Sequence, residues 1–440
     1  MKVTPVDKWI INPIQRFINN STTSGIVLFS SAFLAIILSN SPWSHEFHEL
    51  WELKFSIGFN GHFINKNLHH WINDGLMAVF FFVVGLELKR EIVAGELRNP
   101  KSAILPIAAA IGGMLLPATI YLIFNPSGST ADGWGIPMAT DIAFALGVLY
   151  LLGDKVPLSL KIFLTVLAIV DDIGAVLVIA FFYTSDINFV SLATGGVFML
   201  ILIISNLIGI RNTIYYAIIG IGGLWLAFLM SGVHATIAAV LAAMTIPVNV
   251  KISEKEYIKR IKNLIFKFEE EEPNNNPAVT PNQLHIIQDI RDYSKSALTP
   301  LQRLELRMYP LVAFIIMPIF ALSNAGIVLS SDSLNQIISP VFFGVFVGLL
   351  VGKVLGVYGI VSILLKFKWV TLPRGMNKVH LLGVGFLAAI GFTMSLFIGG
   401  LAFIDKVHIE EAKMGVLFAS VFASFAGFFI IKYANKIKTI

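Results

Sequence analysis

The sequence predicts an all-α membrane protein in which about twelve transmembrane helices form one domain over residues 1–440. Three observations predict this fold class. First, 56% of the residues are hydrophobic, only 13% are charged, and the mean hydropathy is +0.78, far above the soluble range. Second, apolar runs long enough to cross a bilayer recur along the chain. Third, basic residues concentrate in alternate connections between those runs.

The apolar runs define the predicted spans. Unpaired backbone groups are too costly in lipid, so each run is expected to be a helix and not a loop or an open strand. The polar first twenty residues lack a signal-peptide core with a cleavage site, so we expect the first run to be a retained span. The spans are predicted near 22–41, 72–88, 102–123, 134–151, 158–183, 188–209, 213–231, 233–249, 309–329, 338–365, 379–403 and 414–431.

Two polar segments interrupt the spans. Segment 42–70 is predicted to be external and long enough to fold, and segment 250–307 to be a hydrophilic cytoplasmic loop. In the second segment, EKEYIKRIKNLIFKF reads as a basic amphipathic helix on the membrane surface. FEEEEPNNNP reads as a solvated, flexible linker.

The basic residues predict the orientation. With the N-terminus, the C-terminus and the even-to-odd loops on one side, that side holds 27 of the 32 Lys and Arg. The other side holds four, and Lys353 lies within a span. By the positive-inside rule both termini are cytoplasmic. The net charge of +5 therefore reflects topology, and we expect no nucleic-acid partner.

Asp171 and Asp172 lie side by side in the apolar run from Leu158 to Tyr183, with roughly ten apolar or small residues on each side. Each charge at that depth costs about 2.5–3.5 kcal/mol on insertion scales. A buried polar cluster of purely structural use is the alternative. The pair indicates a path for a cation or a proton.

Other polar groups occur at the same depth. Thr140 and Asp141 follow Gly135 and Pro137 in a short, broken span, and Lys353 is central to a glycine-rich span. The predicted eleventh span carries no charge but is also rich in small and polar residues, namely Gly383, Gly385, Gly391, Thr393 and Ser395. Two interrupted helices in corresponding halves are typical of a transporter site, where Asp141 and Lys353 would neutralise the helix ends.

The residue types constrain the chemistry. A small hard cation such as sodium prefers the oxygen ligands that carboxylates, Thr hydroxyls and free backbone carbonyls supply. Burial and a neighbouring carboxylate both favour binding of a proton, so such a site holds protons or a cation and rarely both. With no cysteine, disulfide and thiolate chemistry are excluded. We expect no cofactor and no enzymatic activity.

The chain resembles the NhaA-type sodium/proton antiporters in stretches that cover nearly its whole length in order. They are WINDGLMAVFFFVVGLELKRE (71–91), ATDIAFALGVL (139–149), LAIVDDIGAVLVIAFFY (167–183), SGVHATIAA (231–239), FALSNAGI (320–327), GKVLGV (352–357) and GFTMSLFI (391–398). The resemblance implies inverted repeats, with the broken fourth and eleventh spans crossing.

The resemblance also implies roles. Asp171 and Asp172 would bind sodium and protons beside Thr140 and Asp141, and Lys353 would be the partner of Asp171. Transport of sodium, and usually lithium, would be electrogenic and would support sodium and pH homeostasis. It would take place in the bacterial inner membrane, with 42–70 as a dimer contact.

One stretch departs from the family pattern. Where family members often carry histidines before the ninth span, this chain has Leu306 and Tyr309, although Glu305 is retained. A pH response would then come from competition between sodium and protons at Asp171 and Asp172, which we favour, or from other groups. The candidates for a pH response or a cytoplasmic entrance are Glu87, Lys89, Arg90, Glu91, Glu305 and His234. The charges at the end of the second span also read as solvated topology determinants, and His234 as a helix-end histidine.

Several alternatives are open. Thr140 can bond a carbonyl of its own helix, Asn324 can bond across helices, and Asp74 can be polar lining. An intramembrane aspartyl protease also uses two aspartates, but on different helices in a GxGD context, and Leu152-Gly153-Asp154 falls in a loop. A proton-coupled transporter of organic solutes is the closer alternative, and a channel is the third.

Overall fold

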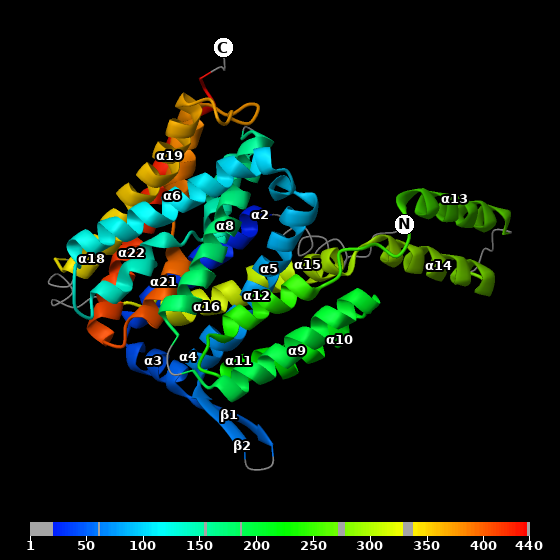
Figure 1. Ribbon diagram of the computed structural model, residues 1–440, viewed down its shortest axis with the longest axis horizontal. Coiled ribbons are helices and arrows are strands. Elements are labelled where there is room, and N and C mark those ends of the chain that lie inside the picture. Colours follow the sequence, from blue (N-terminus) through cyan, green and yellow to red (C-terminus); the bar gives the residue numbers. More distant parts are fainter. Residues whose placement is uncertain are drawn as a thin grey trace.

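The structure is a computed structural model that describes residues 21–59, 62–153, 156–184, 187–271, 278–328 and 338–437. The polar N-terminal twenty residues, Asp154 and the end of the acidic linker lie outside these ranges. The described part is a bundle of helices with a two-stranded hairpin at one end and a pair of helices projecting from the body (Figure 1). It is therefore all-α in its membrane part, as the sequence predicts.

The first half of the bundle contains these helices in order: α2 (Ser21–Ser39), α5 (Met77–Ala94), α6 (Pro100–Phe124), α7 (Ile142–Tyr150), α8 (Leu158–Phe182) and α9 (Phe189–Ile208). A π-helical turn, Trp71–Leu76, leads into α5, and a 3₁₀ helix, Ala131–Met138, precedes α7. Asn99, Asn188 and Asp141 cap α6, α9 and α7 by accepting hydrogen bonds from backbone N–H groups of the first turn.

The second half continues with α10 (Thr213–Ile219), α11 (Leu226–Leu229), α12 (Ala235–Thr245), α15 (Pro300–Leu311), α16 (Met317–Asn324), α18 (Pro340–Val347), α19 (Val354–Lys366), α20 (Lys378–Ala388), α21 (Phe392–Ala402) and α22 (Lys406–Ala434). Short π-helical segments join α10 to α11, α15 to α16 and α18 to α19, so each pair runs on as one helix. The last of these segments, Gly348–Lys353, ends at the buried lysine.

Fewer helices are long and apolar enough to span a membrane than the twelve that the sequence predicts. Among the described residues, seven helices are long and apolar enough to cross a membrane, or up to nine if each of two bent pairs counts as one span. The helices at the predicted second, seventh and eighth spans exist but fall short, because α5 ends in charged residues and the others are short. Twelve spans therefore stay a prediction.

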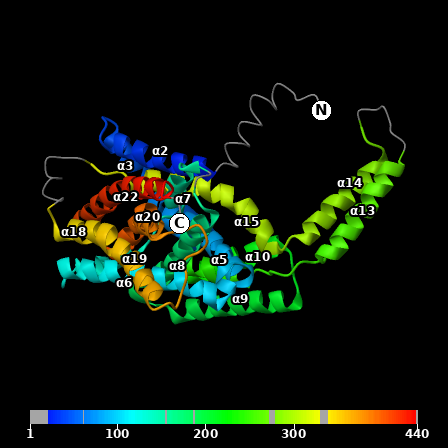
Figure 2. The ribbon, with the colours of Figure 1, turned by 90° about the horizontal axis from the view of Figure 1, so that it is seen from above.

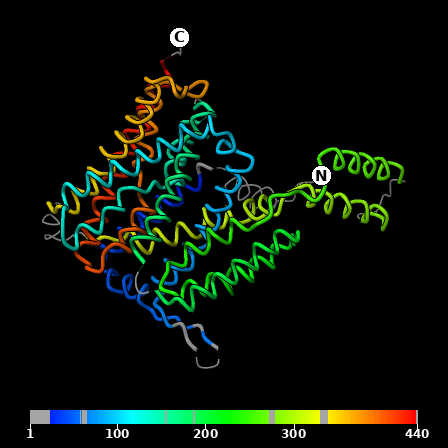
Figure 3. The backbone as a smooth tube through the Cα atoms, in the orientation of Figure 1, coloured from blue at the N-terminus to red at the C-terminus, as the bar shows by residue number. Residues whose placement is uncertain are grey.

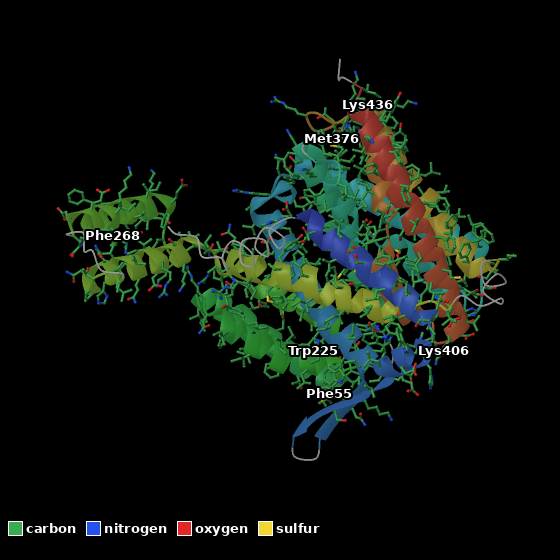
Figure 4. The ribbon with its side chains drawn as sticks, turned by 180° about the vertical axis from the view of Figure 1, so that it is seen from behind. Phe55, Trp225, Phe268, Met376, Lys406 and Lys436 are labelled. Atoms are coloured by element: carbon green, nitrogen blue, oxygen red, sulfur yellow. The ribbon has the colours of Figure 1, made fainter. Side chains whose placement is uncertain are left out.

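Segment 42–70 is folded. It contains α3 (Ser44–Glu52), the antiparallel strands β1 (Lys54–Phe59) and β2 (His62–Asn67), and α4 (Leu68–His70). The tube trace shows the hairpin extending from one end of the body (Figure 3). In Figure 4, Phe55 of the hairpin, Trp225 and Lys406 lie at that end, while Met376 and Lys436 lie at the opposite one. We call the first the hairpin end.

Segment 250–307 is mostly helical. It forms α13 (Glu254–Glu270) and α14 (Pro281–Ala297), and its last residues already belong to α15. Figures 1 and 2 show α13 and α14 side by side, projecting from the bundle as an arm. The helix expected at α13 is present, but α14, which a Thr280–Gln283 capping box begins, was not predicted. We call the end of the body from which the arm leaves the arm end.

Candidate ion-binding site

Helix α8 carries the two aspartates into the middle of the bundle. Asp171 and Asp172 lie near the centre of Leu158–Phe182, and their exposed fractions are 0% and 1%. Successive residues on a helix point about 100° apart, so the two carboxylates face different neighbours. Their surroundings differ accordingly.

Asp171 is paired. Its Oδ2 lies 2.8 Å from Nζ of Lys353, and both side chains are fully buried. Oγ1 of Thr140 lies 2.8 Å from the same carboxylate oxygen and also 2.8 Å from the carbonyl oxygen of Ala388. The Thr140 hydroxyl therefore lies within hydrogen-bond distance of Asp171 and of α20, and it does not bond a carbonyl of its own span. A hydroxyl has one hydrogen, so only one of these two oxygens can accept it at a time.

Asp172 is not paired. Neither of its carboxylate oxygens has a hydrogen-bond partner within the described part of the chain, and the same holds for Oδ1 of Asp171. Buried polar atoms are almost always hydrogen-bonded, because an unsatisfied one costs free energy. Three carboxylate oxygens without partners on adjacent residues are thus an exception, and either a proton or a cation would satisfy them.

Two broken helices meet beside this pair. In the fourth predicted span, the 3₁₀ helix Ala131–Met138 and α7 are separated by an extended backbone at Ala139 and Asp141. In the eleventh, α20 and α21 bend by 43° at their junction. The N–H of Asp141 donates to the carbonyl of Ile390 at 2.7 Å, which joins the two breaks directly. The sequence predicted both interruptions.

Asp141 binds the beginnings of two helices. Its Oδ1 accepts the N–H of Phe144 in α7 at 3.0 Å, and its Oδ2 accepts the N–H of Thr393 in α21 at 3.1 Å. The hydroxyl of Thr393 donates to the same Oδ2. Helix N-termini carry partial positive charge, so one carboxylate neutralises both. Sequence reasoning had noted Thr393 only as part of a polar span and missed this contact.

Lys353 binds the end of a helix. Besides Asp171, its ammonium group donates to the carbonyl of Met138, at the C-terminus of the 3₁₀ helix. Gly352 lets the segment that carries Lys353 pack closely against α6, because a Cβ at position 352 would lie only 2.7 Å from Cα of Pro117. The carbonyls of Met138 and Ala388 could not be identified from residue types, since every residue has one.

A cavity of about 430 Å³ opens at the arm end and reaches Ile142 and Ala143, the residues after Asp141. Glu87, Arg90 and Glu305 line its mouth. The guanidinium of Arg90 donates to Glu305 at 2.7 Å and to Glu91 at 3.1 Å. Leu306 and Tyr309 also line it and are 67% and 42% exposed.

The other candidate residues lie elsewhere. Nζ of Lys89 donates to the carbonyls of Met244 and Ile246, both at 2.6 Å, and so caps the end of α12. His234 lies at the opposite end of α12, where Nε2 is 2.8 Å from the carbonyl of Tyr183. The length of α12 separates His234 from Lys89, so His234 lies away from the cavity mouth, and a role for it in the pH response stays a prediction.

Asn324 and Asp74 make contacts that fit a structural role. Nδ2 of Asn324 donates to Oδ1 of Asn73 at 3.2 Å, which is a bond across helices. Asp74 accepts a hydrogen bond from Lys66 at 3.1 Å, at the hairpin end. Over the ranges that the structure describes, no three His, Cys, Asp or Glu side chains gather closely enough to hold a metal ion. A cation at the aspartate pair would therefore need hydroxyl, carbonyl or water oxygens as well.

Comparison with known proteins identifies the family. The family model described as Na+/H+ antiporter 1 matches residues 15–431. The chain belongs to that family. It is 48% identical to the Na(+)/H(+) antiporter NhaA of Oleidesulfovibrio alaskensis over 429 residues, which are 97% of this chain and 95% of the relative. It is 47% identical to the NhaA of Acidithiobacillus ferrooxidans over 422 residues, 95% of this chain and 96% of the relative.

A third relative, Na(+)/H(+) antiporter NhaA 2 of Syntrophotalea carbinolica, is 45% identical over 427 residues, 97% of each chain. Membership confirms the predicted resemblance, and with the apolar helices it makes the chain a multi-pass membrane protein. The family is one of transporters.

Proposed function

We propose that the protein exchanges sodium for protons across the membrane by letting the two cations compete for the oxygens of Asp171 and Asp172. The observation that carries this proposal is Asp172, a buried carboxylate without a protein partner beside a paired one. A proton satisfies such a group, and so does a desolvated sodium ion completed by hydroxyl and carbonyl oxygens. Because one set of oxygens serves both, binding of one releases the other.

Lys353 couples the two states in this proposal. While no cation is bound, its ammonium group balances the charge of Asp171 at 2.8 Å. A sodium ion or a proton on the pair removes the need for that balance and frees Lys353, so its charge can respond to occupancy. Exchange of more protons than sodium ions, with lithium also accepted, follows the family resemblance. The transport is then electrogenic.

Thr140 and Asp141 have separate roles in the proposal. Thr140 offers a hydroxyl oxygen next to Asp171, and Asp141 holds the two broken helices together at their N-termini. Access alternates as the crossing moves relative to the rest of the bundle. The cavity at Glu87, Arg90 and Glu305 is the entrance from the cytoplasm. Glu87, Arg90 and Glu305, together with Glu91, would admit the cations and take part in the pH response.

The setting of the proposal is the bacterial inner membrane with both termini cytoplasmic, as the basic residues predict. Segment 42–70, with its exposed hairpin, is the proposed contact of a homodimer. In the cell the exchange would support sodium and pH homeostasis.

The test is reconstitution in liposomes that contain a pH-sensitive dye and hold a pH gradient. Addition of sodium or lithium should collapse the gradient, while potassium and organic anions should not. Collapse by an organic solute in the absence of sodium would instead identify a proton-coupled solute transporter. Sodium flux that does not saturate and moves no protons would identify a channel. Either result contradicts the proposal.

A further inference from the structure

Three phenylalanines meet beyond the inner end of the cavity. The ring centroids of Phe81 and Phe397 are 5.8 Å apart, and those of Phe320 and Phe397 are 6.2 Å apart. Phe81 and Phe320 are fully buried and Phe397 is 3% exposed. They come from α5, α16 and α21, three helices that meet next to the candidate site. We call these three side chains the aromatic plug.

The order of residues along each helix places the plug between two polar regions. On the helix Pro300–Asn324, Glu305 and Met317 line the cavity, Phe320 follows, and Asn324 ends the helix at the hairpin end. On α5, Phe81 likewise lies between the hairpin end and Glu87. On α21, Phe397 lies one turn beyond Thr393, which binds Asp141. The plug therefore lies between the cavity side and the hairpin end.

A chain of hydrogen bonds lies on the far side of the plug. Nδ2 of Asn324 donates to the carbonyl of Phe320 at 3.1 Å and to Oδ1 of Asn73 at 3.2 Å. Nδ2 of Asn73 is 3.1 Å from Nε2 of His69, and Nδ1 of His69 is 3.1 Å from Oγ of Ser323. This chain joins the end of α16 to the residues that lead into α5. We call these bonds the latch.

The latch fixes the protonation of its histidine. Because the amide group of Asn73 donates to Nε2 of His69, that nitrogen must be an acceptor, and the ring proton is on Nδ1. The orientation of Asn73 is set in turn by Asn324, which uses both of its amide hydrogens. A neutral His69 is thus part of the closed arrangement. Burial and the nearby charge of Lys413 lower its pKa to about 4, in agreement.

We infer that the aromatic plug is the gate that seals the ion site from the hairpin end, and that the latch holds this gate closed. The inference rests on the proposed exchange, since alternating access needs a barrier on each side in turn. Apolar rings exclude water, and a constriction without water blocks a hydrated cation. For the site to face the hairpin end, α16 and the start of α5 must separate, which breaks the latch.

The first experiment tests the plug. Phe81→Ala and Phe397→Ala should each open a path, raising sodium efflux without proton movement from reconstituted liposomes by about tenfold or more. Phe81→Leu keeps an apolar barrier and should leak little. Phe425→Ala is the matched control, since Phe425 is 63% exposed on α22, away from the plug. Folded plug variants that leak no more than this control would overturn the inference.

The leak is separable from the exchange. Adding Asp172→Asn to Phe81→Ala should leave the leak intact, because a leak through an open gate needs no binding site. Exchange that survives in Asp172→Asn alone would refute the proposed function, whatever the plug variants do. Absence of a leak with loss of exchange in Asp172→Asn would refute the gate alone.

The second experiment tests the latch. The natural chain has no cysteine, so Asn73→Cys with Asn324→Cys introduces a single possible disulfide. The side chains that it replaces are 3.2 Å apart. Oxidation should stop sodium/proton exchange, and reduction should restore it, while each single variant stays insensitive to oxidant. If the protein with a proven disulfide exchanges at the rate of its reduced form, these segments do not separate and the latch is refuted.

Discussion

Two ion-paired regions lie on different helices of the bundle and differ in their contact with water. At the site, Lys353 and Asp171 are 2.8 Å apart with 0% of either side chain exposed. At the cavity mouth, Arg90 and Glu305 are 2.7 Å apart, but 38% of the Arg90 side chain is exposed. The two pairs have nearly the same distance between their charged atoms, but only the pair at the cavity mouth is in contact with water.

The difference determines what each pair can do. Water and salt screen the mouth pair, so its charges can change partners at small cost. The buried pair is unscreened, and removal of either partner leaves a charge without compensation. In the proposed exchange, only the buried pair can therefore couple the binding of a proton or a sodium ion to the conformation of the protein.

The largest expected effects are at the aspartate pair. Asp172→Asn and Asp171→Asn should both abolish exchange, with at least about a hundredfold loss, because each removes an ionisable oxygen. Their stabilities should differ. Asp172 has no partner to lose, so Asp172→Asn should unfold at no lower temperature than wild type. Asp171→Asn should unfold at a lower temperature, because it leaves the buried charge of Lys353 without a counter-charge. Thermal unfolding beside dye-based flux measures both, and substantial exchange in either variant would refute the assignment.

The next effect sharpens the contrast between the buried and exposed pairs. Lys353→Ala leaves Asp171 buried without a countercharge, which should cost about 3–5 kcal/mol. The matched change at the mouth, Arg90→Gln, should cost at most about 1 kcal/mol. If Lys353 also carries a proton, its loss changes the charge moved per sodium, and the reversal potential reports this. An unchanged reversal potential with lower stability would leave Lys353 a purely structural role.

A smaller effect is expected at His69, which is half-buried at the hairpin end. Its pKa of about 4 lies below the ordinary 6.5, so the unfolded chain binds the proton more readily. Its contribution to stability is then complete above pH 6.5 and is lost as pH falls through 4. The total is at most about 3 kcal/mol. His69→Gln should flatten the decline of the melting temperature in that window, and an unchanged slope would exclude His69 as its source.

The smallest effects are expected from substitutions at the cavity mouth. If sodium and protons compete directly at Asp171 and Asp172, a higher sodium concentration shifts the profile of exchange activity against pH toward lower pH. Glu305→Gln should then shift that profile little. Leu306→His and Tyr309→His should also change little, because both positions are exposed at the cavity mouth and a histidine there would lie away from the aspartate pair. A profile that is fixed across a hundredfold range of sodium but moves with Glu305→Gln would favour a separate sensor at the mouth.

Sequence reasoning reached the fold class and the interrupted helices because their signals are local. Apolar runs, glycines and charges at membrane depth are visible in windows of a few tens of residues. It also singled out Asp171, Asp172 and Lys353, since buried charges are rare. The ion pair between Lys353 and Asp171 came only from family resemblance, because the residues are far apart in sequence.

What could not be predicted depends on contacts between distant segments. Thr393 binds Asp141 across 252 positions, and no pattern in either segment selects that partner. Backbone carbonyls such as that of Ala388 carry no sequence signal at all. His234 bonds the carbonyl of Tyr183 across 51 positions, a contact that no local pattern selects either. Helix α14 was missed because its polar composition resembles a solvated loop.

The double cap at Asp141 has an electrical consequence. Each helix N-terminus behaves like roughly half a positive charge, so the N-termini of α7 and α21 together match one carboxylate. The crossing then has almost no net charge of its own. A membrane voltage acts with about 2.3 kcal/mol per unit charge per 100 mV, and it exerts little force on a neutral scaffold. In the proposed exchange, the voltage therefore acts on the bound cation and on Lys353 with Asp171 and Asp172, and not on the crossing of the two broken helices.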